Sequence, residues 1–230
     1  MEETDMKINI AIDGPSAAGK STIAKILAER LGYVHLDTGA MYRCCALKAR
    51  RNDIDLDDEA ALCAMLDHTD IQLTPAGDVY LDGEKVNEEI RTDENSLAAS
   101  KVSQFGGVRR EMVKRQQKMA EDKGFIMDGR DIGTVVLPEA EVKVFMTASA
   151  HARAVRRYEQ NKAKNLPTAS VEEIAKEIAE RDERDTTRSE SPLRKAEDAI
   201  AIDTSDMTIE EVVNAVYERA LPYVKAGEEE

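Results

Sequence analysis

The sequence lacks any run of apolar residues long enough to cross a bilayer as a helix, which takes about 20 such residues. Its first five residues, Met1-Glu2-Glu3-Thr4-Asp5, are acidic and contain none of the apolar stretch that a secretory signal requires. An excess of positive charge is also missing, since the formal net charge of the 230 residues is −14 at pH 7. These absences argue against a membrane or nucleic-acid partner and predict a cytoplasmic protein.

Cysteine is scarce, and its spacing argues against a metal-binding or disulfide role. Cys44, Cys45 and Cys63 form no Cys-x-x-Cys pair and do not cluster with the three histidines. Cys44 and Cys45 are adjacent within a helical pattern, where free thiols usually behave as small buried hydrophobes. We therefore expect no disulfide and no cysteine-bound metal.

Residues 14–21 form a complete phosphate-binding loop, Gly14-Pro15-Ser16-Ala17-Ala18-Gly19-Lys20-Ser21. The loop follows the apolar run Ile8–Ile12 and leads into the helical pattern Ser21–Leu31. A strand, a glycine loop and a helix N-terminus together present backbone N–H groups and the positive end of a helix dipole to an anion. A lysine here reaches the β- and γ-phosphates, and the serine hydroxyl can bind Mg²⁺. This context favours a nucleoside triphosphate site over an ordinary glycine-rich turn.

Five short apolar segments predict buried strands separated mostly by helical patterns. They are Ile8–Ile12, Tyr33–Leu36, Phe125–Met127, Val142–Met146 and Ala199–Ile202. This order predicts an α/β fold with a parallel sheet covered on both faces. The residues that directly follow four of these segments are Asp13, Asp37, Asp128 and Asp203. Because ligands bind beyond the carboxyl ends of such strands, we expect the first three near the site, whereas Asp203 is expected to cap a turn.

Two stretches interrupt this pattern. Residues 53–101 contain a short helix and then a hairpin-like segment with an Asp82-Gly83 turn. Residues 149–195 contain two helical patterns, with Ser170 as the expected cap of the second. From His151 to Lys195 we count eleven Lys/Arg, seven of them Arg, against nine Asp/Glu. We interpret this second stretch as a mobile lid that meets an anionic ligand.

The remaining residues, 7–52, 102–148 and 196–225, form the expected core of a single kinase-like chain. The core ends with the helical pattern Thr208–Leu221, which is expected to stop near Pro222. We expect only a short disordered tail after it, at residues 226–230. A phosphate-loop core with one insertion and one arginine-rich lid is the layout of a small phosphotransferase.

The lid contains a helix face that is rich in arginine. Arg181, Arg184, Asp185 and Arg188 fall at positions i, i+3, i+4 and i+7, so they share one face. Phosphoryl transfer requires groups that neutralise dispersed negative charge, and arginines on a closing lid supply them. The alternative is a solvated, salt-bridged helix, which is common in charged chains. The phosphate loop in the same chain favours the catalytic interpretation.

The segment Asp128-Gly129-Arg130-Asp131 directly follows a predicted strand and is a second candidate constellation. A carboxylate at this position orients Mg²⁺ and its waters in phosphate-loop enzymes, which is the role we expect for Asp128. Arg130 adds a phosphate clamp, and Asp131 adds a hydrogen-bond acceptor. A tight turn capped by Asp128 is the alternative.

Two further helices carry candidate residues. Thr38 is placed to cap the helix after Leu36-Asp37, with Arg43 one turn further along. A plain capped helix with a surface arginine is the alternative. On the predicted helix Gly107–Met119 we expect one functional arginine and several solvated basic residues, from the set Arg109, Arg110, Lys114 and Arg115.

Five motifs in this order resemble the bacterial cytidylate kinase family. They are Gly-Pro-Ser-Ala-Ala-Gly-Lys-Ser at 14–21, Leu-Asp-Thr-Gly-Ala-Met-Tyr-Arg at 36–43, Ala-Ala-Ser-Lys-Val-Ser at 98–103 with Val108-Arg109, Asp-Gly-Arg-Asp-Ile-Gly-Thr-Val-Val at 128–136 and Glu-Arg-Asp-Glu-Arg-Asp at 180–185. The resemblance implies a three-layer P-loop kinase fold with a five-stranded parallel sheet. It also implies an insertion at 53–101 that binds a nucleoside monophosphate and an arginine-rich helical lid at 149–195. Gly106-Gly107 departs from the family, where a bulkier or proline-containing stretch is expected.

The resemblance also implies roles for individual residues. Gly14 to Thr22 would hold the ATP phosphates, with Lys20 on the transferred group and Ser21 on Mg²⁺. The phosphate of CMP would be held by Thr38, Arg43, Arg130 and Arg188. The cytosine would be read by Ser100, Arg109 and Asp131, and the ribose would meet Arg181 and Asp185. Arg184 would join the lid contacts around the transferring phosphate, which makes Lys20, Arg130, Arg184 and Arg188 the implied catalytic set.

The implied activity is that of a (d)CMP kinase, which uses ATP and Mg²⁺ to phosphorylate CMP and dCMP in pyrimidine nucleotide metabolism. We expect a monomer. The nearest alternative is a kinase of another nucleoside monophosphate or of a small metabolite such as shikimate. A guanine-specific switch protein is disfavoured, because Asn161-Lys162-Ala163-Lys164 lacks the Asp of Asn-Lys-x-Asp. A structural ATP-binding subunit stays open and would show no turnover with any monophosphate.

Overall fold

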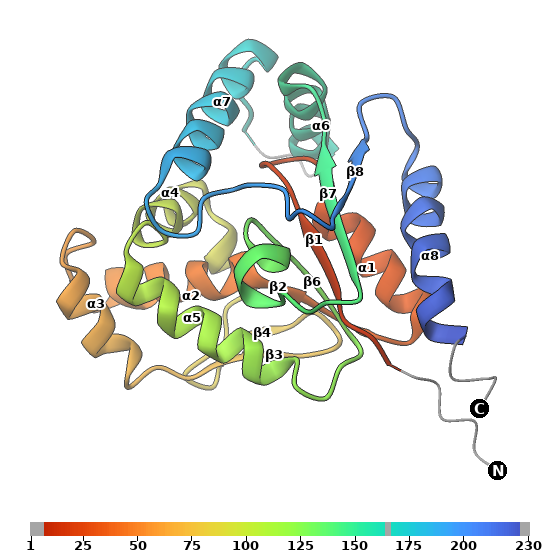
Figure 1. The fold of residues 1–230 in the computed structure, drawn as a ribbon. Helices are drawn as coiled ribbons and strands as arrows, with labels where there is room; N and C mark the ends of the chain where they lie inside the picture. The colour runs from red at the N-terminus through yellow and green to blue at the C-terminus, as the bar shows by residue number, and fades with distance from the viewer. Residues whose placement is uncertain (1–6, 164–166, 226–230) are drawn as a thin grey trace. The chain divides into compact units, whose positions relative to one another are not determined.

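A computed structural model describes residues 7–163 and 167–225, whose contacts divide the chain into two compact units. Unit 1 comprises residues 1–33 and 123–230, and unit 2 comprises residues 34–122. The colour scale of Figure 1 shows that unit 1 contains both the first and the last elements of the chain. The acidic first residues and the tail expected at 226–230 lie outside the described residues.

The main sheet has five strands in the order β2-β6-β1-β7-β8. Their bounds are Ile10–Asp13 for β1, Val34–Asp37 for β2, Phe125–Gly129 for β6, Val142–Thr147 for β7 and Ile200–Asp203 for β8. Within unit 1, β1 pairs in parallel with β6 and β7, and β7 pairs in parallel with β8. The predicted α/β fold with a five-stranded parallel sheet is therefore confirmed, and all five predicted strands form.

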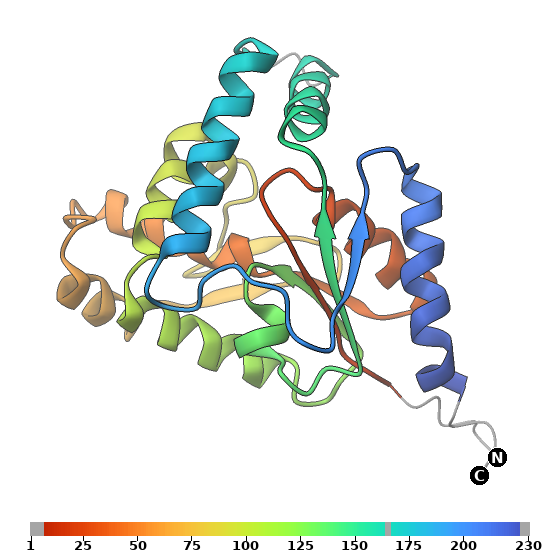
Figure 2. The same ribbon diagram turned by 45° about the horizontal axis from the view of Figure 1, so that its top comes forward.

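Helices α1 (Lys20–Leu31) and α8 (Ile209–Lys225) pack against the strands of unit 1 and against each other. Figure 2 shows α8 running beside β8. Their shared core consists of apolar side chains from β1, β6, β7, β8 and the two helices. The predicted end of the last helix near Pro222 is wrong, because α8 continues to Lys225. Pro222 removes one backbone donor, but the buried face formed by Val212, Val213 and Val216 already anchors the helix.

The lid stretch of unit 1 forms two helices, α6 (Ala150–Ala163) and α7 (Val171–Thr187), which pack against each other. Ser170 caps α7 as predicted, and it forms a complete capping box. The Ser170 side chain accepts a bond from Glu173 N (3.2 Å), and the Glu173 side chain accepts one from Ser170 N (2.9 Å). A small apolar cluster of Ala154, Ile174 and Ile178 joins the helices, and Ala17 of the phosphate loop packs against it.

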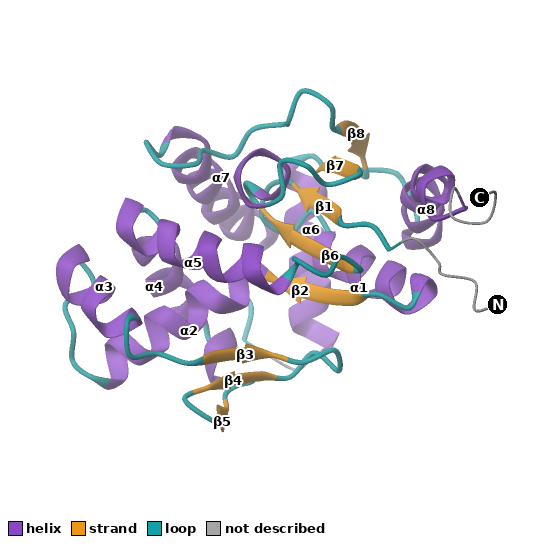
Figure 3. Cartoon of the chain, turned by 60° about the horizontal axis from the view of Figure 1, so that its bottom comes forward, coloured by secondary structure: helices purple, strands orange, loops and turns teal. Residues whose placement is uncertain are grey.

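Unit 2 contains four α-helices and a small antiparallel sheet (Figure 3). The helices are α2 (Thr38–Arg51), α3 (Glu59–Leu66), α4 (Asp93–Val102) and α5 (Gly106–Met119), with a 3-10 turn at Glu89–Arg91. The sheet strands are β3 (Ile71–Leu73), β4 (Val79–Leu81) and β5 (Glu84–Lys85). The predicted Asp82-Gly83 turn joins β4 to β5 with positive φ at both residues, as a tight hairpin requires.

Cys44 and Cys45 are buried on α2, as predicted. Burial raises the pKa of each thiol to about 12, so both stay neutral and pack as small apolar groups. Over the described ranges, we find no helix that combines the length and apolar character needed to span a membrane.

Gly107, one of the two unexpected glycines, has a structural reason in unit 2. The backbone N–H of Gly107 donates to Glu59 Oε1 at 2.5 Å, so a carboxylate from α3 caps the start of α5. A Cβ at position 107 would lie 2.6 Å from Cys63 Sγ and 2.9 Å from Glu59 Oε1. Only glycine therefore lets α3 approach the first turn of α5 this closely.

Replacing Gly107 with alanine is expected to destabilise the protein by about 1–3 kcal/mol, because the added methyl overpacks the contact between α3 and α5. Chemical denaturation measures this change in the free energy of unfolding. Adding Cys63→Ala, which removes the nearest clashing atom, should recover part of the loss. An alanine variant as stable as the wild type would show that the two helices are not held at this distance.

Candidate active site

Two glycines of the phosphate loop, Gly14 and Gly19, leave its backbone open to a bound phosphate. Gly14 has a φ of +149°, and a Cβ there would lie 2.1 Å from the Met146 carbonyl oxygen on β7. Gly19 has a φ of +89° and precedes α1 without a side-chain cap, as its lack of a side chain dictates. The N-terminus of α1 thus directs its positive end toward the loop, which suits a bound phosphate.

Lys20, the first residue of α1, is only 6% exposed and lies inside the loop. Its Nζ donates to the Pro15 carbonyl oxygen at 2.8 Å. Burial, with help from the positive charge of Arg130, lowers the pKa of Lys20 to about 7. A polyphosphate beside this amine would favour its charged form, so the loop is prepared for an anionic ligand.

Ser21 and Asp128 lie together at the ends of α1 and β6, as predicted. The Ser21 hydroxyl donates to Asp128 Oδ2 at 2.7 Å. A hydroxyl and a carboxylate are hard oxygen ligands, and Mg²⁺ typically binds one or two such protein groups together with phosphate oxygens and waters. In the described part of the chain, no three His, Cys, Asp or Glu side chains group to hold a metal by themselves. The pair therefore fits an ion that shares its ligands with a nucleotide.

Asp13, at the end of β1, is 4% exposed. Its carboxylate accepts from the backbone N–H groups of Ile132 (2.8 Å) and Gly133 (2.7 Å). Burial raises the pKa of Asp13 to about 6, although these two hydrogen bonds oppose the shift. Asp13 thereby anchors the start of the π-helix Ile132–Val136, which directly follows Arg130 and Asp131. The strand pattern placed Asp13 near the site but gave no indication of this anchoring role.

The arginines predicted on the lid and after β6 meet around Asp185. Arg130 Nε donates to Asp185 Oδ2 at 2.8 Å, and Arg188 Nη1 lies 3.8 Å from Asp185 Oδ1. Arg188 Nη2 lies 3.9 Å from Asp131 Oδ1. Although burial acts in the opposite direction, Arg130, Arg181 and Arg188 lower the pKa of Asp185. A largely solvated helix face is therefore excluded for Asp185 and Arg188.

The four predicted lid residues do not share one helix face as the spacing suggested. Helix α7 ends at Thr187, and Arg188 occupies the C-cap with extended backbone (φ −60°, ψ 145°). Two nitrogens of its guanidinium, Nε and Nη2, donate to the Ser191 carbonyl oxygen at 2.8 and 2.5 Å. Arg184 is exposed on α7, whereas its neighbour Asp185 is buried. Arg181 is close enough to act on the charge of both Lys20 and Asp185.

In unit 2, Asp37 rather than Thr38 caps helix α2. Its side chain accepts from Ala40 N at 3.2 Å, so the capping role predicted for Thr38 is wrong. Thr38 is instead the buried first residue of the helix. Asp37 Oδ2 also pairs with Arg43 Nη2 at 2.6 Å, and this cation lowers the pKa of Asp37 against the effect of burial. The pair fixes the Arg43 guanidinium beside the start of α2.

The other candidates of unit 2 lie on α4 and α5. Arg109 is 3% exposed, donates to the Ser103 carbonyl oxygen at 3.0 Å and lies over the Tyr42 ring at 5.3 Å. Ser100 lies one turn earlier on α4, near the end that Arg109 contacts. Asn95 Nδ2 donates to the Arg43 carbonyl oxygen at 3.0 Å and so ties α4 to α2. Unit 2 therefore carries Arg43, Ser100 and Arg109 on helices that pack together.

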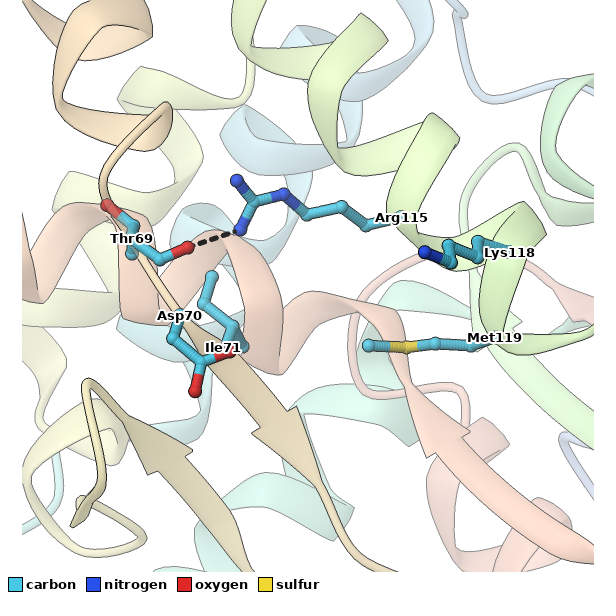
Figure 4. A pocket seen from close by; sticks show the side chains of 6 residues that line it. All are labelled: Thr69, Asp70, Ile71, Arg115, Lys118 and Met119. Carbon is cyan, nitrogen blue, oxygen red and sulfur yellow. Dashed lines mark hydrogen bonds between the residues drawn. The ribbon is translucent and has the colours of Figure 1, made fainter.

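Arg115 on α5 is a structural brace rather than the solvated residue we expected. Its nitrogens donate to the carbonyl oxygens of Leu66 (2.7 Å), the last residue of α3, and of Thr69 (2.8 Å) in the turn beyond it, and to Glu111 (2.7 Å). Figure 4 shows the bond to Thr69 among the residues that line a pocket. The volume of this pocket is about 480 Å³. Since these bonds engage all three guanidinium nitrogens, Arg115 has a structural reason to be where it is.

Two contacts to the phosphate loop were missed from the sequence. Arg153 on α6 and Asp182 on α7 both bond to the backbone of Ser16. Asp182 lies next to Arg181, off the face that the arginine spacing defined, and Arg153 was one of many lid arginines. Only the fold brings these side chains to the loop.

The parallel sheet, the phosphate loop with its buried lysine, and the arginines gathered around Asp185 define a P-loop phosphotransferase. Comparisons with known proteins identify the family. The family model described as cytidylate kinase matches residues 10–221, so the chain belongs to the cytidylate kinase family.

Individual relatives agree with this assignment. The chain is 54% identical to a cytidylate kinase of Bacillus velezensis over 217 residues, which cover 93% of this chain and 96% of the relative. It is 51% identical to a cytidylate kinase of Bacillus subtilis over 217 residues, with the same coverage of both chains. Among solved structures, an uncharacterized protein from Eubacterium ventriosum superposes with a TM-score of 0.50 at 12% identity, covering 96% of this chain and 99% of the other. That likeness concerns the fold alone.

Proposed function

We propose that this enzyme transfers the γ-phosphoryl group of ATP to CMP and dCMP. A phosphate oxygen of the acceptor attacks the γ-phosphorus in line, the bond to the β–γ bridging oxygen breaks, and ADP leaves with that oxygen. The acceptor phosphate is already ionised at neutral pH, so no general base or protein nucleophile is required. The observation that carries the proposal is the family match over residues 10–221.

For the ATP side, we assign the phosphates to Gly14–Thr22. Lys20 lies within the loop with its amine on the Pro15 carbonyl, where it would contact the transferred group. Ser21 and Asp128 would hold Mg²⁺, directly or through its waters. When bound, this ion neutralises part of the charge on the β- and γ-phosphates.

For the CMP side, we assign the phosphate to Thr38, Arg43, Arg130 and Arg188 and the ribose to Arg181 and Asp185. Arg184 joins the contacts around the transferring group. We also propose the functional division into an acceptor-binding insertion at 53–101, a lid at 149–195 and a core formed by the rest. We also propose that the enzyme acts as a monomer.

The cytosine is assigned to Ser100, Arg109 and Asp131. Cytosine presents an N4 amino donor, which suits a carboxylate, and O2 and N3 acceptors, which suit hydroxyl and guanidinium donors. Uracil reverses the donor pattern at ring positions 3 and 4, so a buried carboxylate such as Asp131, which is 5% exposed, would reject it.

Asp131→Ala is therefore expected to reduce the preference for CMP over UMP by about 10-fold or more, because the group that rejects O4 of uracil is gone. The ratio of kcat/KM for CMP to that for UMP measures the preference. Asp122→Ala serves as the control, because it makes the same change at an exposed aspartate to which we assign no role in binding. An unchanged ratio would remove Asp131 from the base-reading set.

ADP formation from Mg-ATP with CMP, dCMP, UMP, AMP, GMP and shikimate in parallel tests the proposed function. Rapid turnover confined to CMP and dCMP is the expected result. Strong turnover with another acceptor would overturn the substrate assignment while leaving a kinase. Silence with every acceptor would indicate a nucleotide-binding module or a structural subunit.

A further inference from the structure

The backbone of Ser16, in the phosphate loop, is bracketed by two lid side chains. Arg153 Nη1 donates to the Ser16 carbonyl oxygen at 3.0 Å, and the Ser16 N–H donates to Asp182 Oδ1 at 3.3 Å. The ring is closed by an ion pair of 2.6 Å between Arg153 Nη1 and Asp182 Oδ2. The backbone carbonyl of Ser16 is thus bonded to a side chain of α6, and its backbone N–H to a side chain of α7.

This ring is largely buried, with Asp182 as its most exposed member. Arg153 is 6% exposed, and its Nε also donates to the Ala148 carbonyl oxygen (2.9 Å) just beyond β7. The Asp182 side chain is 20% exposed. Removing one member of such a pair leaves the other charge poorly solvated and unpaired. The pair therefore constrains the loop more strongly than an exposed ion pair would.

The Ser16 N–H belongs to the same peptide group as the Pro15 carbonyl. That carbonyl accepts the bond from Lys20 Nζ at 2.8 Å. Because a peptide group is planar, Asp182 at one end sets the direction of the carbonyl that holds Lys20 at the other. Arg153 fixes the next peptide group, before Ala17, whose φ is +59°.

On the lid side, Asp182 lies in the same helix as Asp185, less than one turn away. Asp185 holds Arg130 at 2.8 Å, while Asp182 holds the loop. Helix α7 is thus tied at one point to the ATP loop and at another to the arginine that we assign to the acceptor phosphate. One rigid helix spaces these two points.

We propose that Arg153 and Asp182 form a positioning pair for phosphoryl transfer. The pair orients the Pro15–Ser16 peptide, and with it Lys20, relative to Arg130, which Asp185 of α7 holds. This inference rests on the proposed kinase function. Since the contacts on the loop are to main-chain atoms, the pair acts on the position of the loop whatever side chain residue 16 carries.

The test is a double-mutant cycle with Asp182→Ala, Arg153→Met and the double variant, with kcat and the KM values for ATP and CMP as readouts. Each single change is expected to lower kcat/KM for ATP by about 10- to 100-fold, because Lys20 and Arg130 lose their mutual geometry. The KM for CMP should stay within about twofold of wild type. The double variant should match the worse single variant rather than the product of both losses.

Two conservative comparisons keep a folding defect apart from a positioning defect. Asp182→Asn keeps an oxygen for the Ser16 N–H and should recover part of the loss in kcat/KM for ATP. Glu183→Gln makes the same chemical change at the next, exposed residue of α7 and should behave as wild type. Thermal unfolding of every variant is recorded alongside. A lowered midpoint with unchanged kcat and KM for ATP, or losses that multiply in the double variant, would overturn the proposal.

Failure of this inference and failure of the proposed function give different results. If the wild type does not phosphorylate CMP, the proposed function fails. The pair is then judged by the affinity of the same variants for Mg-ATP, measured by calorimetry. Weakened, non-additive binding would keep the positioning pair on the ATP side, whereas affinity equal to wild type would overturn it.

Discussion

Replacing Lys20 with methionine is expected to lower kcat by about 10³-fold or more, because the amine that offsets the charge of the transferring phosphoryl group is lost. Methionine keeps most of the length of the side chain and its fit within the loop. Steady-state ADP formation with saturating ATP and CMP measures the loss. Lys25→Met, at an exposed position of the same helix, is the matched control and should keep wild-type turnover.

The same substitution is expected to stabilise the nucleotide-free protein, most strongly below pH 7. The pKa of Lys20 is about 7 in the folded chain, against an ordinary value of 10.5. Below pH 7 Lys20 is protonated in both the folded and the unfolded chain, so burial of its charge lowers the free energy of unfolding by the full amount. Between these two values the unfolded chain binds more protons, and the wild type gains stability as the pH rises. The advantage of Lys20→Met should therefore shrink from pH 7 upward.

Thermal unfolding of both proteins from pH 6 to pH 9 without nucleotide checks this dependence. Equal midpoints at every pH would show that Lys20 is not held as a buried, unfavourably charged amine. Retained turnover in the methionine variant would separately remove Lys20 from the catalytic set.

Replacing Arg188 with alanine is expected to lower kcat by about 10³-fold, the lower end of the range for an arginine that stabilises transferring phosphate. The side chain is 5% exposed and lies against Asp185 and Asp131, so its guanidinium is held in place before substrate binds. If the contact forms mainly in the transition state, kcat falls and the KM for ATP changes little.

Arg194→Ala is the matched control, because Arg194 is exposed a few residues beyond Arg188. It should leave both kcat and the KM values at wild-type levels. A variant of Arg188 that loses affinity for CMP but keeps kcat would contradict a transition-state role. It would instead show that Arg188 binds the ground state of the acceptor.

Features set by local sequence were predictable. A short apolar run in the sequence indicated each of the five strands of the main sheet. The Asp82-Gly83 turn and the Ser170 cap follow from local backbone chemistry. The neighbours Ser21 and Asp128 were also foreseeable, since the carboxyl ends of parallel strands meet at one edge of the sheet.

Features set by tertiary partners were not predictable in this way. Helical spacing put Arg188 on the face of α7, but the helix stops one residue earlier and the Ser191 carbonyl captures the guanidinium. Asp182 shares a motif with Arg181, yet its bond to Ser16 joins residues that are 166 positions apart. The periodicity of a single segment cannot predict a contact between residues so far apart in the sequence.

The start of α5 is supplied by another helix, since Glu59, 48 residues upstream, accepts the N–H of Gly107. Arg115 of α5 in turn donates to the carbonyl of Leu66, the last residue of α3, and to that of Thr69 just beyond it. The contact between the two helices thus supplies an acceptor to the start of α5 and donors to the end of α3 and to the turn after it. A peptide of residues 106–119 alone would lack the acceptor for its Gly107 N–H, so the order of the helix that carries Arg109 depends on the presence of α3.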